Sequence, residues 1–315
     1  MTAVFMFPGQ SSRYPAMIEK LAREPACAPI LARASEVLGR DLAAHYRTDN
    51  AGALAANRDV QIGVFLANHL HHAVLTAAGA CASWSLGLSL GEYNHLVHIG
   101  ALAFEDALPL VDARGRLYDE AEGGLMVSVF PVDGALVDEV IARLGLAERA
   151  CVGLYNSPRQ QVISGDRDAV EQIVAAIEID VFVDATVIEP RIPMHSPVFA
   201  ATATRFAEVL AKTPFTPPRL PYVPNTRGAI VDANAETIRA CLTEHVYRPV
   251  RWQASVEAVA ARVVDPVFVE VGPKAVLFNL FGRGWTPGAR HKTDAPDDTW
   301  PVHVRGVVEE LRRAG

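Results

Sequence analysis

A serine flanked by glycines is the clearest chemical signal in the sequence. The segment Gly87-Leu88-Ser89-Leu90-Gly91 fits the pattern GxSxG, in which a sharp turn between a strand and a helix exposes a serine hydroxyl as a nucleophile. Glycines on both sides allow the backbone to bend that tightly. Small residues precede this motif and an apolar-periodic stretch follows it, as a strand and a helix would require. The start of that helix would direct N–H groups toward an oxyanion.

A nucleophilic serine needs a base, and histidine is the usual one. His95 and His98 follow Ser89 on the expected helix, about 9 and 14 Å along its axis, which is too far to accept the proton. His195 instead lies in a short turn between a strand and a long helix, where catalytic side chains are often held. We therefore expect His195 to be the base, and a purely structural turn histidine is the alternative.

Two further side chains could bind substrate. Helical spacing places Arg114 on the apolar face of a helix over residues 104–121, so its guanidinium must find an ion pair or await an anionic ligand. Asp112 and Glu120 are the possible internal partners. Gln10 directly follows the first strand, and its amide could donate a hydrogen bond to an oxyanion.

Apolar runs predict the elements that position these residues. Short buried strands are expected at 3–7, 80–86 and 267–271, and a long buried helix at 59–77. Strands buried on both faces and alternating with helices are typical of an α/β core with a mostly parallel sheet.

The middle of the chain has a different pattern. Its order is strand, helix, strand, strand, helix, strand, which predicts a ferredoxin-like subdomain inserted into the core. We therefore expect a large core from 1–124 and 191–315 and a small subdomain from 125–190. The stretch 286–301 is predicted to be a surface loop before a last helix. The expected elements of the insert are 125–130, 134–144, 150–155, 161–164, 166–177 and 181–188.

Composition restricts the class of protein. The 315 residues are 50% hydrophobic and have a formal net charge of -7, which argues against a nucleic-acid partner. No apolar run reaches the length of a membrane span, and the N-terminus lacks the pattern of a signal peptide. The four cysteines are scattered, as in a reducing compartment, so we expect a cytoplasmic protein. His69 and His72 share a helix face, but no third ligand accompanies them, and we predict no metal site.

Several ordered blocks resemble one family, the malonyl-CoA:acyl-carrier-protein transacylases, which includes the acyltransferases of polyketide synthases. The resemblance runs nearly end to end and is far more specific than GxSxG alone. The matching blocks are Phe7-Pro8-Gly9-Gln10, Gly87 to Tyr93, Gly100 to Ala107, Arg114-Gly115, Tyr155 to Pro158, Val162 to Gly165, Pro193 to Ser196, Tyr247 to Trp252 and Glu270 to Pro273.

The resemblance implies a hydrolase-like α/β core with a ferredoxin-like insert, and a ping-pong mechanism. Ser89 would attack an acyl-CoA with His195 as base, while the Leu90 N–H and Gln10 hold the oxyanion. The phosphopantetheine thiol of an acyl carrier protein would then take the acyl group, and no cofactor would stay bound. Arg114 matches the arginine that pairs with the malonate carboxylate. A backbone carbonyl near Arg251 would orient the histidine.

Other positions bear on the acyl group. The resemblance implies that Leu88, Met194 and Asn156 contact substrate. Leu88 stands where many relatives have histidine, and Met194 where polyketide domains often have Phe or Ser. Arg13 also departs from the pattern; it could add charge to the acyl pocket, but a solvent-facing position is favoured. Pro109 could kink the helix that contains Arg114.

Three functions remain open from the sequence. Malonyl transfer to a carrier protein in fatty-acid or polyketide synthesis is favoured, with another acyl group as a variant. A hydrolase that edits acyl-carrier-protein thioesters is the second, and a scaffold that binds a carrier protein without chemistry is the third. Because carrier proteins are acidic, docking needs a basic face, for which Arg283, Arg290 and Lys292 are candidates.

Overall fold

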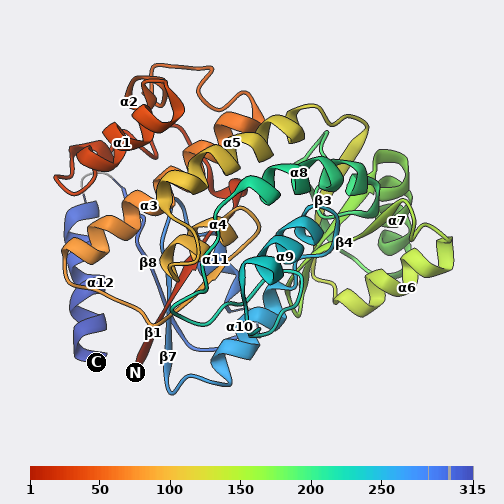
Figure 1. The fold of residues 1–315 in the computed structure, drawn as a ribbon. Coiled ribbons are helices and arrows are strands. Elements are labelled where there is room, and N and C mark those ends of the chain that lie inside the picture. Colours follow the sequence, from red (N-terminus) through yellow and green to blue (C-terminus); the bar gives the residue numbers. More distant parts are fainter. Residues whose placement is uncertain (283, 297–298, 315) are drawn as a thin grey trace.

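The chain forms two lobes, each built around its own sheet. The computed structural model describes residues 1–282, 284–296 and 299–314. Figure 1 shows the large lobe around β1, β7 and β8, and the small lobe with α6 and α7 beside it. The predicted α/β class, with a mostly parallel sheet and a ferredoxin-like subdomain, is confirmed.

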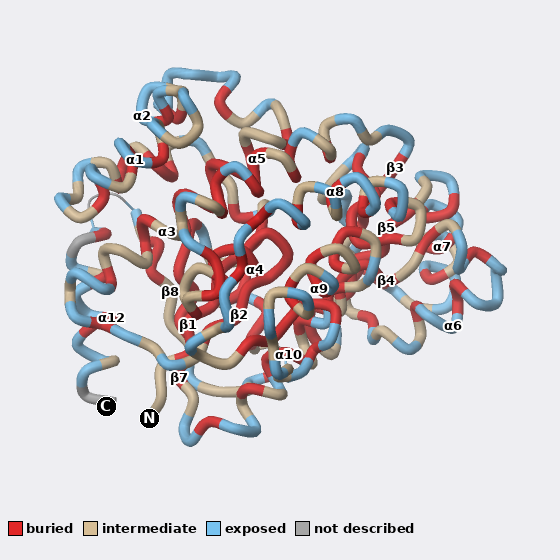
Figure 2. The backbone as a smooth tube through the Cα atoms, viewed as in Figure 1, coloured by how far each residue is buried: buried red, intermediate tan, exposed pale blue. Residues whose placement is uncertain are grey.

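The large-lobe sheet consists of four parallel strands in the order β2-β1-β7-β8. Its central strands are apolar and buried, as the tube in Figure 2 shows, because helices cover them. Parallel pairing aligns Phe7 at the end of β1 with Gly87 at the end of β2, so the loops after both strands emerge side by side. The strands are β1 (Thr2–Phe7), β2 (Trp84–Gly87), β7 (Pro266–Glu270) and β8 (Ala289–Lys292).

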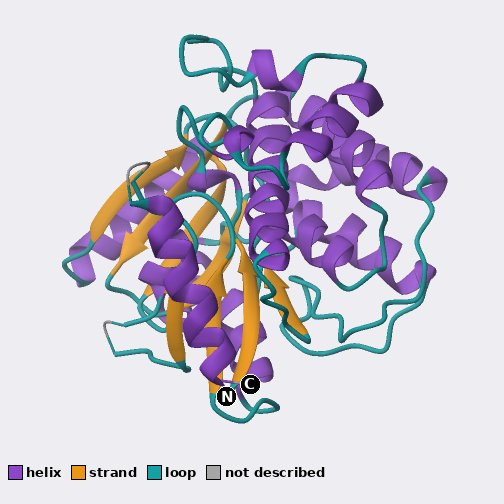
Figure 3. Ribbon diagram, turned by 90° about the vertical axis from the view of Figure 1, so that its left-hand side faces the viewer, coloured by secondary structure: helices purple, strands orange, loops and turns teal. Residues whose placement is uncertain are grey.

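Helices surround this sheet, and they pack against the strands in the turned view of Figure 3. Helix α4 contacts β1 and β2, helix α12 contacts β1, and α3 packs along α5. The α-helices of the large lobe are α1 (Ala28–Leu38), α2 (Leu42–His45), α3 (Asn57–Ala77), α4 (Gly91–His98), α5 (Phe104–Asp119), α8 (Ala200–Lys212), α9 (Ala235–Tyr247), α10 (Trp252–Ala260), α11 (Val276–Leu280) and α12 (Trp300–Ala314). Short 3-10 turns lie at Gln10–Ser12, Leu21–Arg23 and Pro197–Phe199.

The small-lobe sheet is antiparallel, with strand order β4-β5-β3-β6. Successive side chains in a strand point to opposite faces. Val127 and Ile163 therefore pack in a core with α6 and α7, whereas Met126 and Val162 belong to the core of the large lobe. The elements are β3 (Gly124–Phe130), α6 (Gly134–Leu144), β4 (Ala150–Ser157), β5 (Gln160–Asp166), α7 (Arg167–Asp180) and β6 (Asp184–Glu189).

Main-chain hydrogen bonds join the two lobes at β4. The Tyr155 N–H donates to the Val250 carbonyl at 2.9 Å, and the Val250 N–H donates to the Gly153 carbonyl at 2.8 Å. A segment of the large lobe just before α10 therefore extends the edge of the small-lobe sheet.

The predicted loop at 286–301 is wrong in part. Residues Ala289–Lys292 form β8, which pairs in parallel with β7, and α12 begins at Trp300. The segment Ala-Arg-His-Lys has no apolar pattern, and the backbone ladder at the sheet edge holds it instead. The last strand of the insert begins at Asp184 rather than at 181. Within the described ranges, every helix is too short or too polar to cross a bilayer.

Candidate active site

Ser89 lies on a strained turn between β2 and α4. Its φ is 51°, in the left-handed region that non-glycine residues seldom adopt. A Cβ on Gly87 would lie 2.1 Å from the Gly91 carbonyl oxygen, and a Cβ on Gly91 would lie 2.0 Å from the Phe7 carbonyl oxygen. Both glycines of the motif are therefore required by close backbone approach. The turn presents the Ser89 side chain at the carboxyl ends of β1 and β2.

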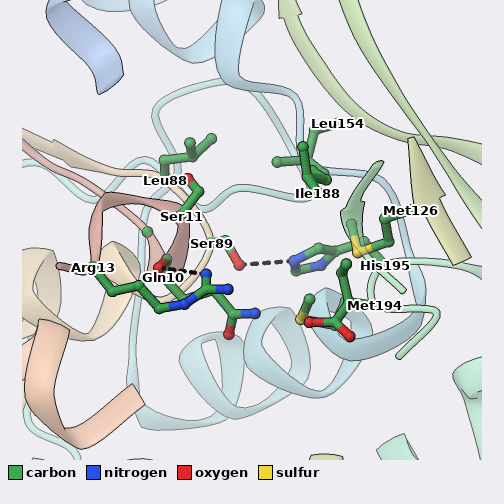
Figure 4. A pocket seen from close by; sticks show the side chains of 12 residues that line it. Gln10, Ser11, Arg13, Leu88, Ser89, Met126, Leu154, Ile188, Met194 and His195 are labelled. Carbon is green, nitrogen blue, oxygen red and sulfur yellow. Dashed lines mark hydrogen bonds between the residues drawn. The ribbon is translucent and has the colours of Figure 1, made fainter. Parts of the chain in front are cut away.

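The structure brings His195 to this serine. Ser89 Oγ lies 2.8 Å from His195 Nε2, and the two side chains face each other in Figure 4. His195 Nδ1 donates to the His245 carbonyl at 2.6 Å, so Nε2 is left to accept the serine proton. The His195 N–H donates to the Val246 carbonyl at 3.0 Å. The predicted orienting carbonyl near Arg251 is therefore wrong, since the acceptor belongs to the end of α9.

Burial keeps the His195 ring neutral. Burial, with a smaller contribution from the positive charge of Arg114, lowers the pKa of His195 to about 3. The His245 ring stacks on His195 with centroids 4.8 Å apart, and burial also lowers the pKa of His245. His245 Nδ1 lies 3.3 Å from the carboxylate of the buried Glu92. A base that is neutral and held on one tautomer is ready to accept a proton.

Asn225 holds the nucleophile turn from a distant part of the chain. Its Oδ1 accepts from the Ser89 N–H at 2.7 Å, and its amide nitrogen donates to the Gly87 carbonyl at 2.6 Å. Glu92 accepts hydrogen bonds from the Asn225 N–H and from Tyr222. Sequence reasoning assigned no role to Glu92, and it missed Asn225 and His245 because no local pattern connects these two residues with Ser89.

Gln10 and Leu90 flank the serine on two adjacent loops. Gln10 begins the 3-10 turn after β1 and lines the same pocket as Ser89. Leu90 precedes the first residue of α4, so its N–H lies at the positive end of that helix. Gly9 keeps the loops close, since a Cβ there would lie 2.9 Å from the Leu88 carbonyl oxygen.

The pocket in front of Ser89 lies between the lobes (Figure 4). Leu88 and Met194 line it, as expected of residues that would contact substrate, and Met126, Leu154 and Ile188 form its small-lobe wall. Asn156 lines an adjoining hollow that shares Leu88 and Leu154 with this pocket.

Arg13 lines this pocket too, so the prediction that it faces solvent is wrong. Its guanidinium donates to the Gln10 carbonyl at 3.2 Å, which turns the side chain back toward the active site (Figure 4). Sequence reasoning could not find this position, because the local 3-10 turn sets the direction of the side chain.

Arg114 is a buried cation on α5. It is 1% exposed, and its Nη1 donates to Gln61 Oε1 at 2.7 Å, while Nε and Nη2 have no hydrogen-bond partner within the described residues. Among the residues that the structure describes, the alternative of an ion pair within the protein is not observed for Arg114. Asp112 pairs with Arg58 and Arg116 instead, and Glu120 pairs with Arg205. Although Pro109 lies inside α5, the helix continues through it and keeps Arg114 in the core.

Of the three candidate docking cations, Arg290 is engaged in contacts within the protein. The Arg290 guanidinium donates to the Phe278 and Phe281 carbonyls and lies over the Phe278 ring. These contacts hold the guanidinium against its own chain. Lys292 lies on β8, and Arg283 lies outside the described residues. Of the two histidines weighed as metal ligands, His69 stacks on Phe104 at 4.2 Å, and the described residues contain no group of three metal-ligating side chains.

A serine on a tight strand-to-helix turn, hydrogen-bonded to a neutral histidine in an α/β fold, is the arrangement of an enzyme that transfers acyl groups through serine. The chain belongs to the acyl transferase domain family, whose model matches residues 4–298.

Characterised relatives agree with this family. The malonyl CoA-acyl carrier protein transacylase of Escherichia coli K12 is 33% identical over 284 residues, covering 89% of this chain and 91% of the relative. An acyl-carrier-protein S-malonyltransferase from Burkholderia pseudomallei 1710b has a TM-score of 0.90 at 27% identity, covering 98% of this chain and 100% of that one. A malonyl-transacylase solved in complex with its type II polyketide synthase carrier protein has a TM-score of 0.86 at 30% identity, covering 95% and 99%.

Proposed function

We propose that this chain transfers a malonyl group from coenzyme A to the phosphopantetheine thiol of an acyl carrier protein, in fatty-acid or polyketide synthesis. The observation that favours a malonyl group is Arg114, a buried guanidinium whose Nε and Nη2 have no hydrogen-bond partner among the described residues. Leaving these donors unpaired in the core is costly, and a carboxylate could accept from both of them. Malonate provides that carboxylate, whereas an acetyl group does not.

In the first half-reaction Ser89 Oγ attacks the thioester carbonyl carbon while its proton passes to His195 Nε2. The resulting oxyanion would accept hydrogen bonds from the Leu90 N–H and the Gln10 amide. The bond to sulfur then breaks, coenzyme A leaves as a thiol with the proton from His195, and a malonyl ester remains on Ser89. The His195 Nδ1–H bond to the His245 carbonyl would stay in place throughout.

In the second half-reaction the carrier thiol takes the place of coenzyme A. His195 removes the thiol proton, the sulfur attacks the malonyl ester, and Ser89 recovers its proton as its bond to the acyl carbon breaks. The chain needs no resident cofactor for either step, since coenzyme A and phosphopantetheine arrive with the substrates. We also propose a cytoplasmic location, which the four unpaired cysteines support.

The test is to follow acylation of the intact protein by mass spectrometry. Incubation with malonyl-CoA should add one malonyl group, peptide mapping should locate it on Ser89, and Ser89→Ala should remain unmodified. Acetyl-CoA should label the wild type more slowly. Labelling of Ser89→Ala, or equal rates with both thioesters, would contradict the proposal.

A second measurement separates transfer from editing hydrolysis. The malonylated enzyme is isolated and incubated either with holo acyl carrier protein or with buffer alone. We expect rapid loss of the malonyl group to the carrier protein and slow loss in buffer. Equal loss in both, with free malonate as the product, would identify a hydrolase.

A further inference from the structure

A fully buried carboxylate lies behind the serine and histidine of the site. Glu92 is the second residue of α4, the helix that follows the turn of Ser89. Its Oε1 accepts from the Tyr222 hydroxyl at 2.6 Å, and its Oε2 accepts from the Asn225 N–H at 3.3 Å. His245 Nδ1 lies 3.3 Å from the same Oε2. Three donors and the first turn of a helix all favour a negative charge at this carboxylate.

The carboxylate of Glu92 determines which nitrogen of His245 carries the proton. Burial lowers the pKa of His245, so the ring is neutral and has a single N–H. An ionised carboxylate can only accept, so the proton belongs on Nδ1. His245 Nε2 has no hydrogen-bond partner among the described residues, a position that a lone pair tolerates better than an N–H. The bond from Nδ1 to Glu92 therefore polarises the ring and makes its faces more negative.

The polarised ring of His245 lies against the catalytic base. The rings of His245 and His195 stack with centroids 4.8 Å apart and planes inclined by 25°. His195 becomes a cation when it accepts the Ser89 proton, and a cation is attracted to an aromatic face at such a distance. The Nδ1 of His195 donates to a main-chain carbonyl, which has no formal charge. The positive charge of Arg114 opposes the cation, and a negative charge on Glu92 would offset that opposition.

We propose that Glu92 and His245 are positioning residues that stabilise the imidazolium form of His195 in the transition state, the carboxylate acting through the stacked ring. This inference rests on the proposed acyl transfer. The attraction exists only while His195 is charged, so it lowers the barrier to acylation without strengthening the binding of malonyl-CoA.

The acylation rate should then depend on the ionisation of Glu92. Burial raises the pKa of Glu92 to about 7, while the hydrogen bond from Tyr222 and the charge of Arg114 oppose that rise. The pKa of His195 is about 3, so its titration lies far below this range. The rate should therefore rise with pH through a midpoint near 7, as Glu92 loses its proton. The other titratable or charged groups around Glu92 keep one protonation state across this range; they are His245 and Cys241 on α9, Tyr222 before α9, Arg114 on α5 and Tyr93 on α4.

Glu92→Gln tests this dependence with nearly the same shape and no charge. The rate of Ser89 acylation is measured in a single turnover at saturating malonyl-CoA, from about pH 6 to about pH 9. Above the midpoint the variant should be slower by about tenfold, the size of a buried contact between a cation and an aromatic face. KM should change less than about twofold, because the lost interaction belongs to the transition state. The rise near pH 7 should be absent.

Tyr222→Phe moves the midpoint without removing the carboxylate. The Tyr222 hydroxyl lowers the pKa of Glu92, so its loss should shift the midpoint to higher pH. Well above that midpoint the rate should match the wild type, since Glu92 still ionises. The matched control is Glu270→Gln, which removes a second buried carboxylate whose pKa is raised to about 7. Glu270 accepts from the main chain of α11, and its loss should leave the midpoint unchanged.

His245→Phe tests the path through the ring. This variant keeps a flat ring and the main-chain carbonyl that holds His195, but it has no donor for Glu92. Its rate above the midpoint should fall to that of Glu92→Gln. In the Glu92→Gln background, His245→Phe should have little further effect, because the two residues act as one unit. Multiplicative effects would show that the ring does not transmit the charge.

The outcomes distinguish this inference from the proposed function. A rise near pH 7 that persists in Glu92→Gln, or a Tyr222→Phe midpoint that stays in place, would overturn the role of Glu92. If thermal unfolding shows that Glu92→Gln does not fold, the midpoint of Tyr222→Phe decides alone. A wild type that forms no acyl-enzyme with any acyl-CoA at any pH would instead overturn the proposed function.

Discussion

Strained backbone conformations and histidine residues are distributed very differently between the two lobes. In the large lobe, parallel strands end together, and the loops that follow them present Gln10, Ser89 and neighbouring groups at one edge. In the small lobe, antiparallel strands form a wall with one face toward the cleft and the other on its own core. Among the described residues, the non-glycine residues in left-handed conformations are Ala16, Ser89, His195, Asp265 and Lys274.

All five of these residues lie outside the small lobe, and so do all ten histidines. Strained conformations and buried titratable groups lower stability and are retained where function requires them. The large lobe therefore contains the strained and buried titratable features of the site, and the small lobe contributes apolar side chains to the pocket wall. The following experiments test this division.

The largest expected effect is on the core of the small lobe. Ile163 is fully buried between its sheet and helices, so Ile163→Ala should lower the free energy of unfolding by about 2–5 kcal/mol. Val187→Ala, at a position 56% exposed in the same lobe, is the control and should change it by less than about 0.5 kcal/mol. Acylation of Ser89 by the folded Ile163→Ala protein should stay near the wild-type rate. A folded variant without acylation would show that the division between the lobes is false.

Substituting one buried arginine in the large lobe and one exposed arginine in the small lobe separates an effect on activity from an effect on stability. Arg114→Met should lower kcat/KM for malonyl-CoA more than about tenfold, because the partner of the malonate carboxylate is lost, and neutral acyl thioesters should be spared. Its free energy of unfolding should change little, since an apolar side chain replaces a buried cation without a carboxylate partner. Steady-state kinetics measures kcat/KM, and chemical denaturation measures the free energy of unfolding.

Arg149→Met is the matched substitution in the small lobe. Arg149 forms exposed ion pairs with Asp166 at 3.0 Å and Asp168 at 2.6 Å. Such pairs contribute about 0–1 kcal/mol, so the variant should be slightly less stable and equally active. Equal loss of malonyl-CoA activity in both variants would remove Arg114 from substrate recognition.

Lowering the pH should destabilise the large lobe and leave the stability of the small lobe nearly unchanged. Burial lowers the pKa of His69, His71, His95 and His195 to about 3, from 6.5. Below pH 6.5 the unfolded chain therefore binds protons that the folded chain does not, and the free energy of unfolding falls as the pH falls toward 3. The expected slope is about 1.4 kcal/mol per pH unit for each net proton.

Two carboxylates in the large lobe reduce this slope without reversing it. Burial raises the pKa of Glu92 and of Glu270 to about 7, so the folded state gains protons there between pH 4.5 and 7. In the small lobe, burial raises the pKa of Asp138, so mild acid should stabilise that lobe slightly. Hydrogen exchange at pH 7 and pH 5 should show protection lost mainly from α3 and α4. Faster exchange in α6 and α7 would contradict the comparison.

The local chemistry of the site was predictable because it has a sequence pattern. The glycines around Ser89, the turn at His195 and the apolar stripe interrupted by Arg114 are all visible in the sequence. Alternation and period also predicted the ferredoxin-like order of the small lobe. These signals depend only on neighbours along the chain.

The supporting groups were not predictable in this way, because tertiary packing brings them together. Asn225 reaches the nucleophile turn from 136 residues away, and His245 approaches the turn of His195 from helix α9. Strand β8 has no apolar pattern and forms only because β7 offers a free edge.

The main-chain ladder between β4 and Val250 has a consequence for acyl selectivity. Main-chain hydrogen bonds join the two lobes there, so the main chain sets the width of the aperture of the pocket between the lobes. A bulkier thioester then cannot be admitted by simply spreading the lobes apart. Selectivity for chain length and branching is left to the volume of side chains such as Met194 and Met126, which project into that aperture.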